Sequence, residues 1–402
     1  MANVSSSNGL EKRPKLRFPG FDEPWHGKPF GDLIQEYSDR TQTEDEDTLL
    51  SAAIEGMFLN SELFGHQRGA SNKGYKKIKY GTMVLSTQNL HLGNANVNLR
   101  FKNGMVSPAY KTYDITGCSI ELLAHWIKSD AAKHFFYNAT TVGASMCRRN
   151  VEWKTLYEQP LFLPSTDEQD KIASFLSFLT QRIDAQQKYV ATLKKYKRGL
   201  QNRFFFKRSH LSPKASEIDS HDVEPLGSVV HINPKTGSLP EAFIYIDLEC
   251  VESGVLNSKK LISRNSAPSR AQRLLEEGDL LYQMVRPYQK NNYYFQKGFE
   301  YPTVASTGYA QIRCSEMDTQ FIYEQLSSDY FAREAMLRST GTGYPAINAD
   351  DLAEIPIWVP PLNQQEKIGA ALSFLGEKIE VHQKLLSALC SVKSSLLQQL
   401  FI

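Results

Sequence analysis

Hydrophobic residues recur at alternating steps of four and three in two long segments, residues 161–206 and residues 361–402. This spacing predicts helices that each carry one hydrophobic stripe, as in the seam of a coiled coil sustained over about four heptads. No proline follows Pro164 in the first segment or Pro361 in the second, so neither helix is interrupted. The expected helix-helix seam residues are Ile172, Leu176, Leu179, Ile183, Val190, Leu193, Ile368, Leu372, Leu375, Ile379, Leu386 and Leu389.

The two segments are copies of one sequence. They align without a gap at a constant offset of 196 residues, which places Lys171 on Lys367 and Gln169 on Gln365. The same offset places Gly31 on Gly227, far upstream of both helices. The chain therefore contains two copies of one unit, each a globular segment followed by a long helix.

This repeat predicts an α/β (α+β) fold, with two globular mixed α/β domains joined by two long helices. We expect those helices to pack as an antiparallel coiled coil, which gives a pseudo-two-fold internal repeat. The alternative, that each is only a core helix of its own domain, is disfavoured because about 38 residues extend roughly 57 Å. The expected boundaries are a flexible leader 1–16, first domain 17–160, first spacer helix 161–206, linker 207–221, second domain 222–360 and second spacer helix 361–402.

The net charge and its distribution along the chain limit which classes of partner the protein can bind. The chain has 46 basic and 44 acidic residues, a formal charge of +2, which excludes a uniformly basic coat for nucleic acid. Residues 188–214, however, hold nine basic residues and no acidic one. That run is suited to phosphate contacts, or equally to an exposed face or a protein-binding linker. The segment after Met1 is polar, and no apolar stretch reaches the roughly 20 residues of a membrane span, so we expect a soluble cytoplasmic protein.

Motifs for catalysis are missing from the sequence. There is no GxxxxGK[ST] phosphate loop and no GxGxxG turn. Asn233-Pro234 is followed by Lys235-Thr236, unlike the Asn-Pro-Pro-aromatic motif of amino-methyltransferases. The nine histidines and five cysteines show no metal-ligand spacing. We expect no catalytic residue, no metal site and no cofactor bound by this chain. A DNA-modifying enzyme with an unrecognised motif and a purely protein-binding coiled-coil scaffold remain the alternatives.

The helix entries LPSTDEQDKI and PPLNQQEKI, the paired helices and the stretch GTGYPAIN resemble the specificity subunit of Type I restriction–modification systems. The resemblance covers nearly the whole chain. It implies two target-recognition domains that read a bipartite sequence in double-stranded DNA, held by a coiled coil that docks two modification (methyltransferase) subunits. Restriction (motor-nuclease) subunits complete such a complex. S-adenosylmethionine for adenine-N6 methylation, ATP and Mg would all bind those partners, and no membrane is involved.

Base edges are read by Arg, Lys, Asn or Gln side chains, supported by phosphate contacts and stacking. The second globular domain has such residues after a predicted strand at 278–285 and in the Gly-rich stretch 340–348. The first has parallel segments at 104–113 and 141–150. For any single residue, sheet packing or an ordinary surface position is the alternative. The predicted DNA-binding residues are Tyr110, Lys111, Arg148, Arg149, Arg286, Tyr288, Lys290, Tyr344 and Asn348.

Overall fold

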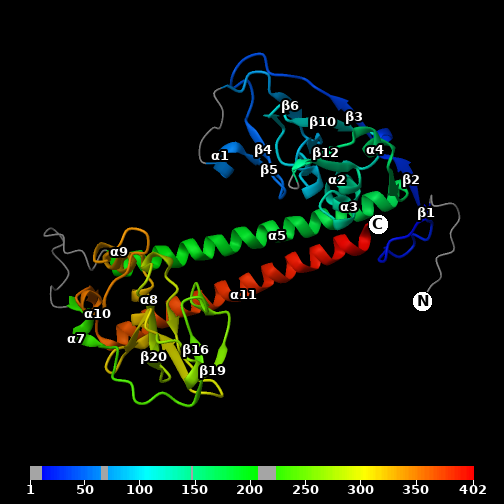
Figure 1. Cartoon of the computed structure of the whole chain (residues 1–402). Helices are drawn as coiled ribbons and strands as arrows, with labels where there is room; N and C mark the ends of the chain where they lie inside the picture. Colours follow the sequence, from blue (N-terminus) through cyan, green and yellow to red (C-terminus); the bar gives the residue numbers. More distant parts are fainter. Residues whose placement is uncertain (1–10, 65–70, 146–147, 207–222) are drawn as a thin grey trace. The chain divides into compact units, whose positions relative to one another are not determined.

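The computed structural model describes the chain except residues 1–10, 65–70, 146–147 and 207–222 (Figure 1). It divides into two compact units. The first comprises Met1–Gln186 with Leu385–Ile402, and the second comprises Gln187–Lys384. Each unit therefore holds one globular domain together with a part of each long helix.

The long helices are α5 (Thr166–Gln201), which continues into one π-helical turn, η3 (Asn202–Phe206), and α11 (Leu362–Leu400). The first helix begins at Thr166 rather than at residue 161. The residues before it form strand β13 (Pro160–Leu163), which pairs with β2 (Trp25–Pro29). The prolines at both ends of this strand favour extended backbone and delay the helix.

In the first unit, the start of α5 packs against the end of α11. Leu176 and Leu397 are buried in the same hydrophobic cluster. One turn further along α5, Lys393 Nζ donates a hydrogen bond to Thr180 Oγ1 at 2.7 Å. Later residues of α5 thus meet earlier residues of α11, so the two helices run antiparallel here.

The second unit repeats this arrangement with the other halves of the helices. The ring of Tyr189 lies 4.7 Å from that of His382. Further along, Leu200 packs against the cluster that contains Leu372. The direction is again antiparallel. All twelve predicted seam residues are buried or half-buried, which is the burial a coiled-coil seam requires.

The domain of the first unit is a set of small antiparallel sheets covered by short helices. Its described strands form the sheets β1 (Glu11–Lys12)-β2-β13, β3 (Ile34–Tyr37)-β10 (Tyr110–Ile115)-β7 (Met83–Ser86)-β8 (Ala95–Val97), β4 (Leu50–Ala52)-β5 (Met57–Leu59), β6 (Lys76–Lys79)-β9 (Asn103–Val106) and β11 (Thr140–Ser145)-β12 (Arg148–Val151). The described helices are η1 (Phe30–Leu33), α1 (Asn60–Phe64), η2 (Leu90–Leu92), α2 (Ile120–Trp126), α3 (Asp130–Asn138) and α4 (Trp153–Glu158).

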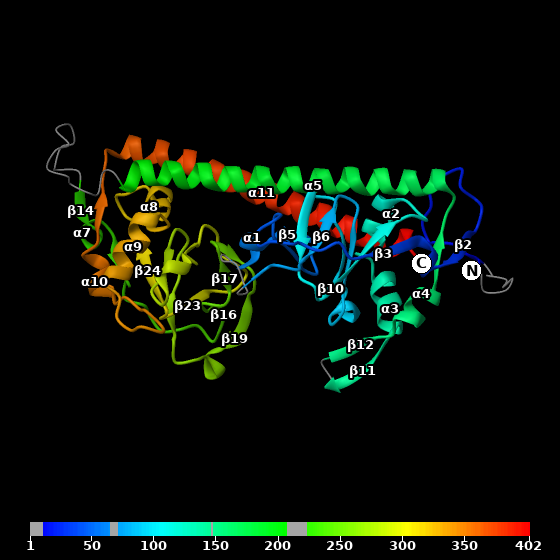
Figure 2. The ribbon, with the colours of Figure 1, turned by 90° about the horizontal axis from the view of Figure 1, so that it is seen from above.

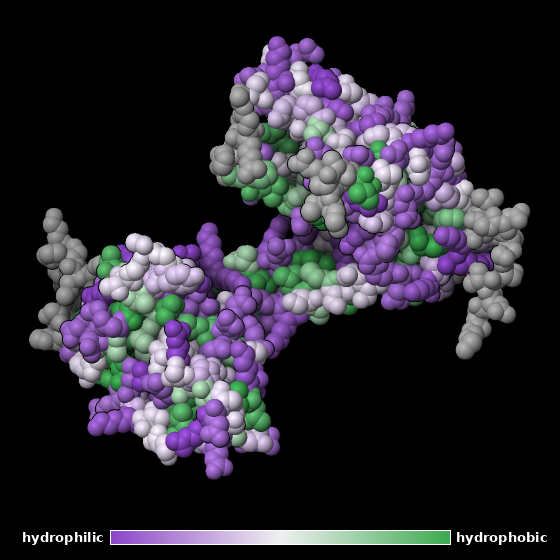
Figure 3. All heavy atoms as spheres, viewed as in Figure 1, coloured by the Kyte–Doolittle hydropathy of each residue, from purple (hydrophilic) through white to green (hydrophobic). Residues whose placement is uncertain are grey.

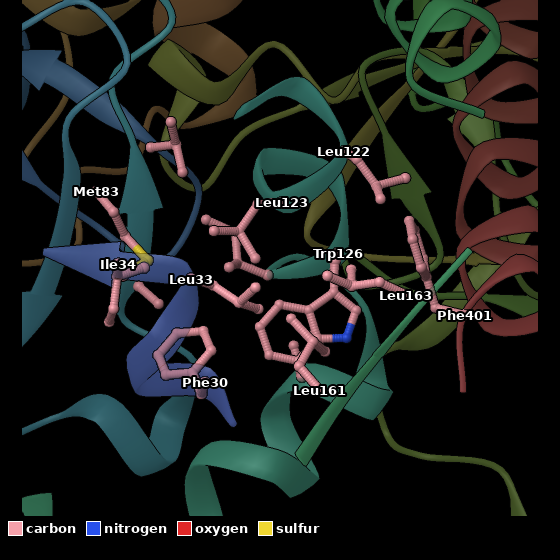
Figure 4. Close-up of a cluster of buried hydrophobic side chains, with 14 of the residues drawn as sticks. Phe30, Leu33, Ile34, Met83, Leu122, Leu123, Trp126, Leu161, Leu163 and Phe401 are labelled. Carbon is pink, nitrogen blue, oxygen red and sulfur yellow. The ribbon is translucent and has the colours of Figure 1, made fainter. Parts of the chain in front are cut away.

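Its core is aromatic and is shared with the long helices. Phe30 packs against Trp126 and Phe136, with ring centroids 6.1 Å and 6.3 Å apart. Phe401, directly after α11, reaches the same cluster (Figure 4). Its ring centroid lies 6.5 Å from that of Trp25. The end of the chain is therefore part of the first domain's core, and burial of these rings supplies much of the hydrophobic stabilisation.

The domain of the second unit is likewise built of small sheets covered by short helices, but the pair of strands Ala242–Ile246 and Thr303–Ser306 is parallel. Its described strands form the sheets β15 (His231–Ile232)-β24 (Tyr309–Arg313)-β21 (Leu280–Gln283)-β22 (Tyr293–Tyr294), β19 (Lys260–Ser263)-β16 (Ala242–Ile246)-β23 (Thr303–Ser306)-β20 (Ala271–Leu274), β14 (Val223–Pro225)-β25 (Pro356–Trp358) and β17 (Val251–Glu252)-β18 (Val255–Leu256). The described helices are α7 (Leu226–Val229), η5 (Arg264–Ser266), η6 (Pro287–Gln289), α8 (Thr319–Leu326), α9 (Asp329–Leu337) and α10 (Ala349–Ala353).

The repeat seen in the sequence is also present in the strand register. Pro29 pairs with Pro160 in the first unit, and Pro225 pairs with Pro356 in the second. Each pair joins the strand that enters a domain to the strand that leaves it. The predicted fold class, two mixed α/β domains with long helices and an internal repeat, is confirmed.

The exterior of both units is mainly hydrophilic on the face in Figure 3, with smaller hydrophobic patches. Across the described residues, no helix combines the length and the apolar character that crossing a membrane requires.

Candidate nucleic-acid interface

The second domain has a strained loop directly after β21. Arg286 and Lys290 both have left-handed backbone conformations, with φ of 55° and 54°, and they flank the short helix η6. Non-glycine residues adopt this conformation at a cost and keep it only where the surroundings hold them. Here the Arg286 N–H donates to the carbonyl of Pro345 at 2.7 Å. The loop is thereby joined to the Gly-rich stretch 340–348.

This junction brings two predicted DNA-binding residues together. The guanidinium carbon of Arg286 lies 4.2 Å from the ring centroid of Tyr344. The tyrosine is 70% exposed and Arg286 is half-buried. Such a stack uses one face of the guanidinium and leaves its N–H edges available. Within the described residues, no hydrogen bond or ion pair of this side chain is seen.

Lys290, at the other end of the loop, is held by a carboxylate. Its Nζ lies 2.5 Å from Asp329 Oδ1, and Arg198 Nε lies 2.5 Å from Asp329 Oδ2. Burial opposes ionisation of this carboxyl, but the hydrogen bonds from Lys290 and Arg198 outweigh it and lower the pKa of Asp329 to about 2. Lys290 therefore anchors the loop to α9, and its contact with DNA stays a prediction.

Tyr288 and Asn348, the two other candidates in this domain, differ in whether their side chains already have a hydrogen-bond partner. Tyr288 is exposed on η6. Asn348 is the N-cap of α10, where its side-chain oxygen accepts a hydrogen bond from the Asp351 N–H at 2.7 Å. A capping side chain is committed to the helix end. Both residues are exposed, but the side chain of Asn348 is already hydrogen-bonded at the start of α10.

Tyr110 and Lys111 lie on β10 of the first domain, and both have local partners. The Tyr110 hydroxyl donates to the Ala52 carbonyl at 3.2 Å, and burial raises the pKa of this tyrosine. Lys111 Nζ lies 2.8 Å from Glu36 Oε2 and 4.3 Å from the centroid of the Trp153 ring. These contacts give Tyr110 and Lys111 a role in holding the domain together. Their role in DNA binding remains a prediction.

Arg148 and Arg149 lie on β12 of the β11–β12 hairpin, which extends away from the other strands of its domain in Figure 2. Arg149 donates from Nε to Thr140 Oγ1 at 2.7 Å and stacks on the ring of Tyr137 at 4.1 Å. Two-stranded ribbons of this size fit the major groove of DNA. Between the two strands, residues 146–147 lie outside the described part of the chain.

The basic run predicted at 188–214 ends outside the described residues, which stop at residue 206 and resume at 223. Its described part forms the last turns of α5 and the π-helical turn η3. Two of its cations pair with the second domain: Lys197 Nζ lies 2.8 Å from Glu324 Oε1, and Arg198 contacts Asp329. Some cations of the run therefore fix α5 to the second domain, and others stay exposed to solvent.

One pair of exposed residues on the long helices lies outside the predicted sites. Phe178 on α5 and Phe374 on α11 occupy the same position of the repeat, and they are 68% and 65% exposed. Single exposed hydrophobic residues are common on protein surfaces. An exposed phenylalanine at the same position of both repeats, however, is a recurring feature that suits a contact site. The constant offset already aligned these two residues, but only their exposure identifies them as surface features.

The described residues contain no group of three or more His, Cys, Asp or Glu side chains placed to hold a metal ion. Within the same described part, Cys118, Cys250, Cys314 and Cys390 are free thiols. Burial raises the pKa of Cys118 to about 11, and burial likewise raises the pKa of Cys314 to about 11. Such thiols are poor nucleophiles near neutral pH.

Residues 249–390 match the family model described as Type I restriction modification DNA specificity domain. The Type I restriction enzyme MjaVIII specificity subunit of Methanocaldococcus jannaschii is 25% identical over 310 residues, which cover 73% of this chain and 69% of that protein. The matched segment is identified as a Type I restriction–modification DNA specificity domain, and the chain as a whole is similar to specificity subunits. These similarities support a role in DNA recognition.

Two solved structures share the fold of this chain over almost its whole length. The Type I restriction–modification S subunit from M. genitalium has a TM-score of 0.61 at 17% identity, covering 97% of this chain and 99% of that one. A chain from a study of complex assembly and conformational transition of the type I R-M system has a TM-score of 0.52 at 15% identity, covering 96% of this chain and 99% of that chain.

Proposed function

We propose that this specificity subunit reads a bipartite target in double-stranded DNA, with each globular domain reading one half. The observation that carries the proposal is the duplicated frame: the Pro29–Pro160 and Pro225–Pro356 strand pairs enclose domains whose exposed segments differ. The first has a hairpin with Arg149, and the second has the Arg286 loop. A shared frame with unlike surfaces suits two different half-sites.

Exchange of residues 17–155 for those of a relative tests this reading. We expect one half of the methylated target to change while the other half stays the same. Mapping methylated adenines in a host that carries the system measures both halves at once. A change in both halves, or in neither, would contradict the assignment of one domain to each half-site.

We further propose that the helices dock two copies of one partner, the modification (methyltransferase) subunit, and that restriction (motor-nuclease) subunits join that complex. The exposed pair Phe178 and Phe374 supports this, because a surface present twice suits two copies of the same partner. Phenylalanine is one of the residues enriched in the buried core of protein interfaces. Each phenylalanine would serve one methyltransferase subunit.

The docking proposal predicts a change in stoichiometry. Phe178→Ala or Phe374→Ala should each remove one methyltransferase subunit, and the double variant should remove both, as measured by native mass spectrometry. Leu261→Ala is the matched control, because Leu261 is an exposed hydrophobic residue on the second domain outside the helices. Full assembly of the double variant at micromolar concentration would exclude these residues as anchors.

The chain itself is proposed to be non-catalytic and to work in the cytoplasm, where its DNA target lies. S-adenosylmethionine, ATP and Mg would bind the partner subunits. Purified chain incubated with S-adenosylmethionine, or with Mg and ATP, and target duplex should leave the DNA unmodified and uncut. Methylation or cleavage in the absence of partners would favour a DNA-modifying enzyme. Loss of all sequence preference in the assembled complex would favour a protein-binding scaffold.

A further inference from the structure

The loop after β21 holds an arginine in a defined orientation with its polar edge unused. The left-handed backbone of Arg286, its N–H bond to Pro345 and its stack on Tyr344 together fix the guanidinium on the surface. Among the arginines and lysines predicted from the sequence whose side chains are described, Lys111, Arg149 and Lys290 have hydrogen-bond or ion-pair partners. The side chain of Arg286 differs from them because, among the described residues, it stacks on an aromatic ring and makes no hydrogen bond or ion pair.

We propose that Arg286 reads a guanine in the half-site of the second domain, and that Tyr344 is the positioning residue for it. This inference rests on the proposed DNA-reading function and deepens it. A guanidinium edge presents two N–H groups whose spacing matches the O6 and N7 acceptors of guanine in the major groove. Stacking on a ring leaves this edge available and reduces the side-chain entropy lost on binding. No other base offers two acceptors in that arrangement.

The surroundings of the loop suit an approach by DNA. Asp329 holds both Lys290, at the end of the loop, and Arg198, on the basic end of α5. The base-reading loop is thereby fixed beside a helix whose Lys194 and Lys195 are exposed. Exposed lysines contribute sequence-independent phosphate contacts that position a reading side chain. The arrangement separates the two tasks: α5 supplies charge, and Arg286 supplies base discrimination.

A phosphate contact by Arg286 is the competing possibility, and the two differ in sequence dependence. Losing a base contact relaxes discrimination at one base pair, whereas losing a phosphate contact weakens binding to every sequence alike. Lysine distinguishes them further, since it keeps the positive charge but lacks the planar fork. Arg286→Lys should therefore retain most nonspecific affinity, and its discrimination at that base pair should decrease, because lysine can reach the guanine acceptors but lacks two fixed N–H groups.

The experiment uses the full chain assembled with its modification partners. The target is first mapped by adenine methylation. Duplexes are then made with each guanine of the second half-site replaced singly by 7-deazaguanine, which lacks the N7 acceptor. For the wild type, we expect one such duplex to bind about 10- to 100-fold more weakly than the normal target. For Arg286→Ala, the same replacement should make almost no further difference, and for Arg286→Lys its effect should be clearly smaller than for the wild type.

Tyr344→Ala should lose part of that discrimination, and Tyr344→Phe should retain it, because the ring rather than the hydroxyl holds the guanidinium. Arg264→Ala is the matched control, an exposed arginine of η5 in the same domain. Thermal unfolding of each complex checks the fold. If the alanine variant fails to fold, Arg286→Lys still decides the question.

Two results would overturn the inference while leaving DNA reading intact: a second half-site without guanine, or a uniform loss of affinity for all duplexes on substitution of Arg286. If the wild-type complex showed no sequence preference at all, the proposed function itself would fail. The two failures are therefore distinguishable in one binding series.

Discussion

Gln169 and Gln365 make the same pair of hydrogen bonds in the two units. Each side-chain oxygen accepts from the backbone N–H of an N-cap residue, Ser119 at 2.9 Å and Asp318 at 3.0 Å. Each side-chain nitrogen donates to the carbonyl of the proline five residues earlier, at 3.0 Å and 2.7 Å. One repeated residue thus fixes the start of each long helix to the first turn of a helix in its globular domain.

Gln169→Ala and Gln365→Ala should each destabilise the chain by about 1–3 kcal/mol, because each leaves a backbone N–H and a carbonyl without their partner in a largely buried setting. Urea unfolding of the purified chain measures the difference. The exposed Gln181 on the same helix provides the control, and Gln181→Ala should change the free energy of unfolding by less than about 0.5 kcal/mol. Equal effects at all three glutamines would contradict this role.

The ion pair between Arg17 and Glu168 should also contribute to stability. Glu168 is 1% exposed and accepts hydrogen bonds from Arg17 at 2.6 Å and 2.9 Å and from Trp25 Nε1 at 3.2 Å. Removing the cation leaves a buried charge, so Arg17→Met should cost about 3–5 kcal/mol in unfolding free energy. The double variant Arg17→Met with Glu168→Gln should recover part of that loss. A further loss in the double variant would count against the explanation.

Acid should destabilise the first domain through His125. Its ring is buried, with Nε2 3.0 Å from Ser177 Oγ. Burial, together with the nearby charge of Lys393, lowers the pKa of this histidine from 6.5 to about 4. Between these two pH values His125 is protonated in the unfolded chain but neutral in the folded chain. The free energy of unfolding therefore falls as the pH decreases from about 6.5 toward 4.

His125→Gln should flatten the dependence of unfolding free energy on pH between about 7 and 5, although it lowers the stability at pH 7. Urea unfolding at several pH values measures the slope. His231→Gln, at an exposed position, is the control and should leave the slope as in the wild type. An unchanged slope in His125→Gln would show that another group controls this acid transition.

Asp329 should affect the stability of the second domain at lower pH than His125 affects the first. Its ordinary pKa of 3.8 is lowered to about 2, since the hydrogen bonds from Lys290 and Arg198 outweigh the effect of burial. Its stabilising contribution is therefore fully present above about pH 4 and is lost as the pH falls through 2. Asp329→Asn should be less stable than the wild type at pH 7, and the difference should shrink toward pH 2. A constant difference in thermal midpoint would contradict the ionic origin.

Periodicity and repetition were sufficient to predict the architecture. The four-and-three spacing around Leu176 and Leu372 depends only on the geometry of a helix and on the burial of one stripe. The 196-residue offset then required two equivalent units, and the Pro225–Pro356 register bears this out. The first helix begins later than expected because the pairing of Pro160–Leu163 with β2 is a tertiary contact that helical periodicity does not contain.

The candidate interface was less predictable. Arg286 and Lys290 stand four residues apart and look alike in the sequence, yet one is stacked on Tyr344 and the other is paired with Asp329. These partners lie 58 and 39 residues further along the chain (Arg286 to Tyr344 and Lys290 to Asp329). Which cation is neutralised depends on the packing of α9 against the loop, and no local pattern encodes that packing.

The sequence by itself therefore determined the repeated unit, the two long helices and the chemical types suited to DNA. These follow from short-range rules: side-chain spacing along a helix, proline at its start, and the exclusion of hydrophobic residues from water. Only the tertiary structure decided which of the alike residues are partnered and which are available. Hydrogen bonds and ion pairs act over a few ångströms, so their partners are fixed only when distant segments pack together.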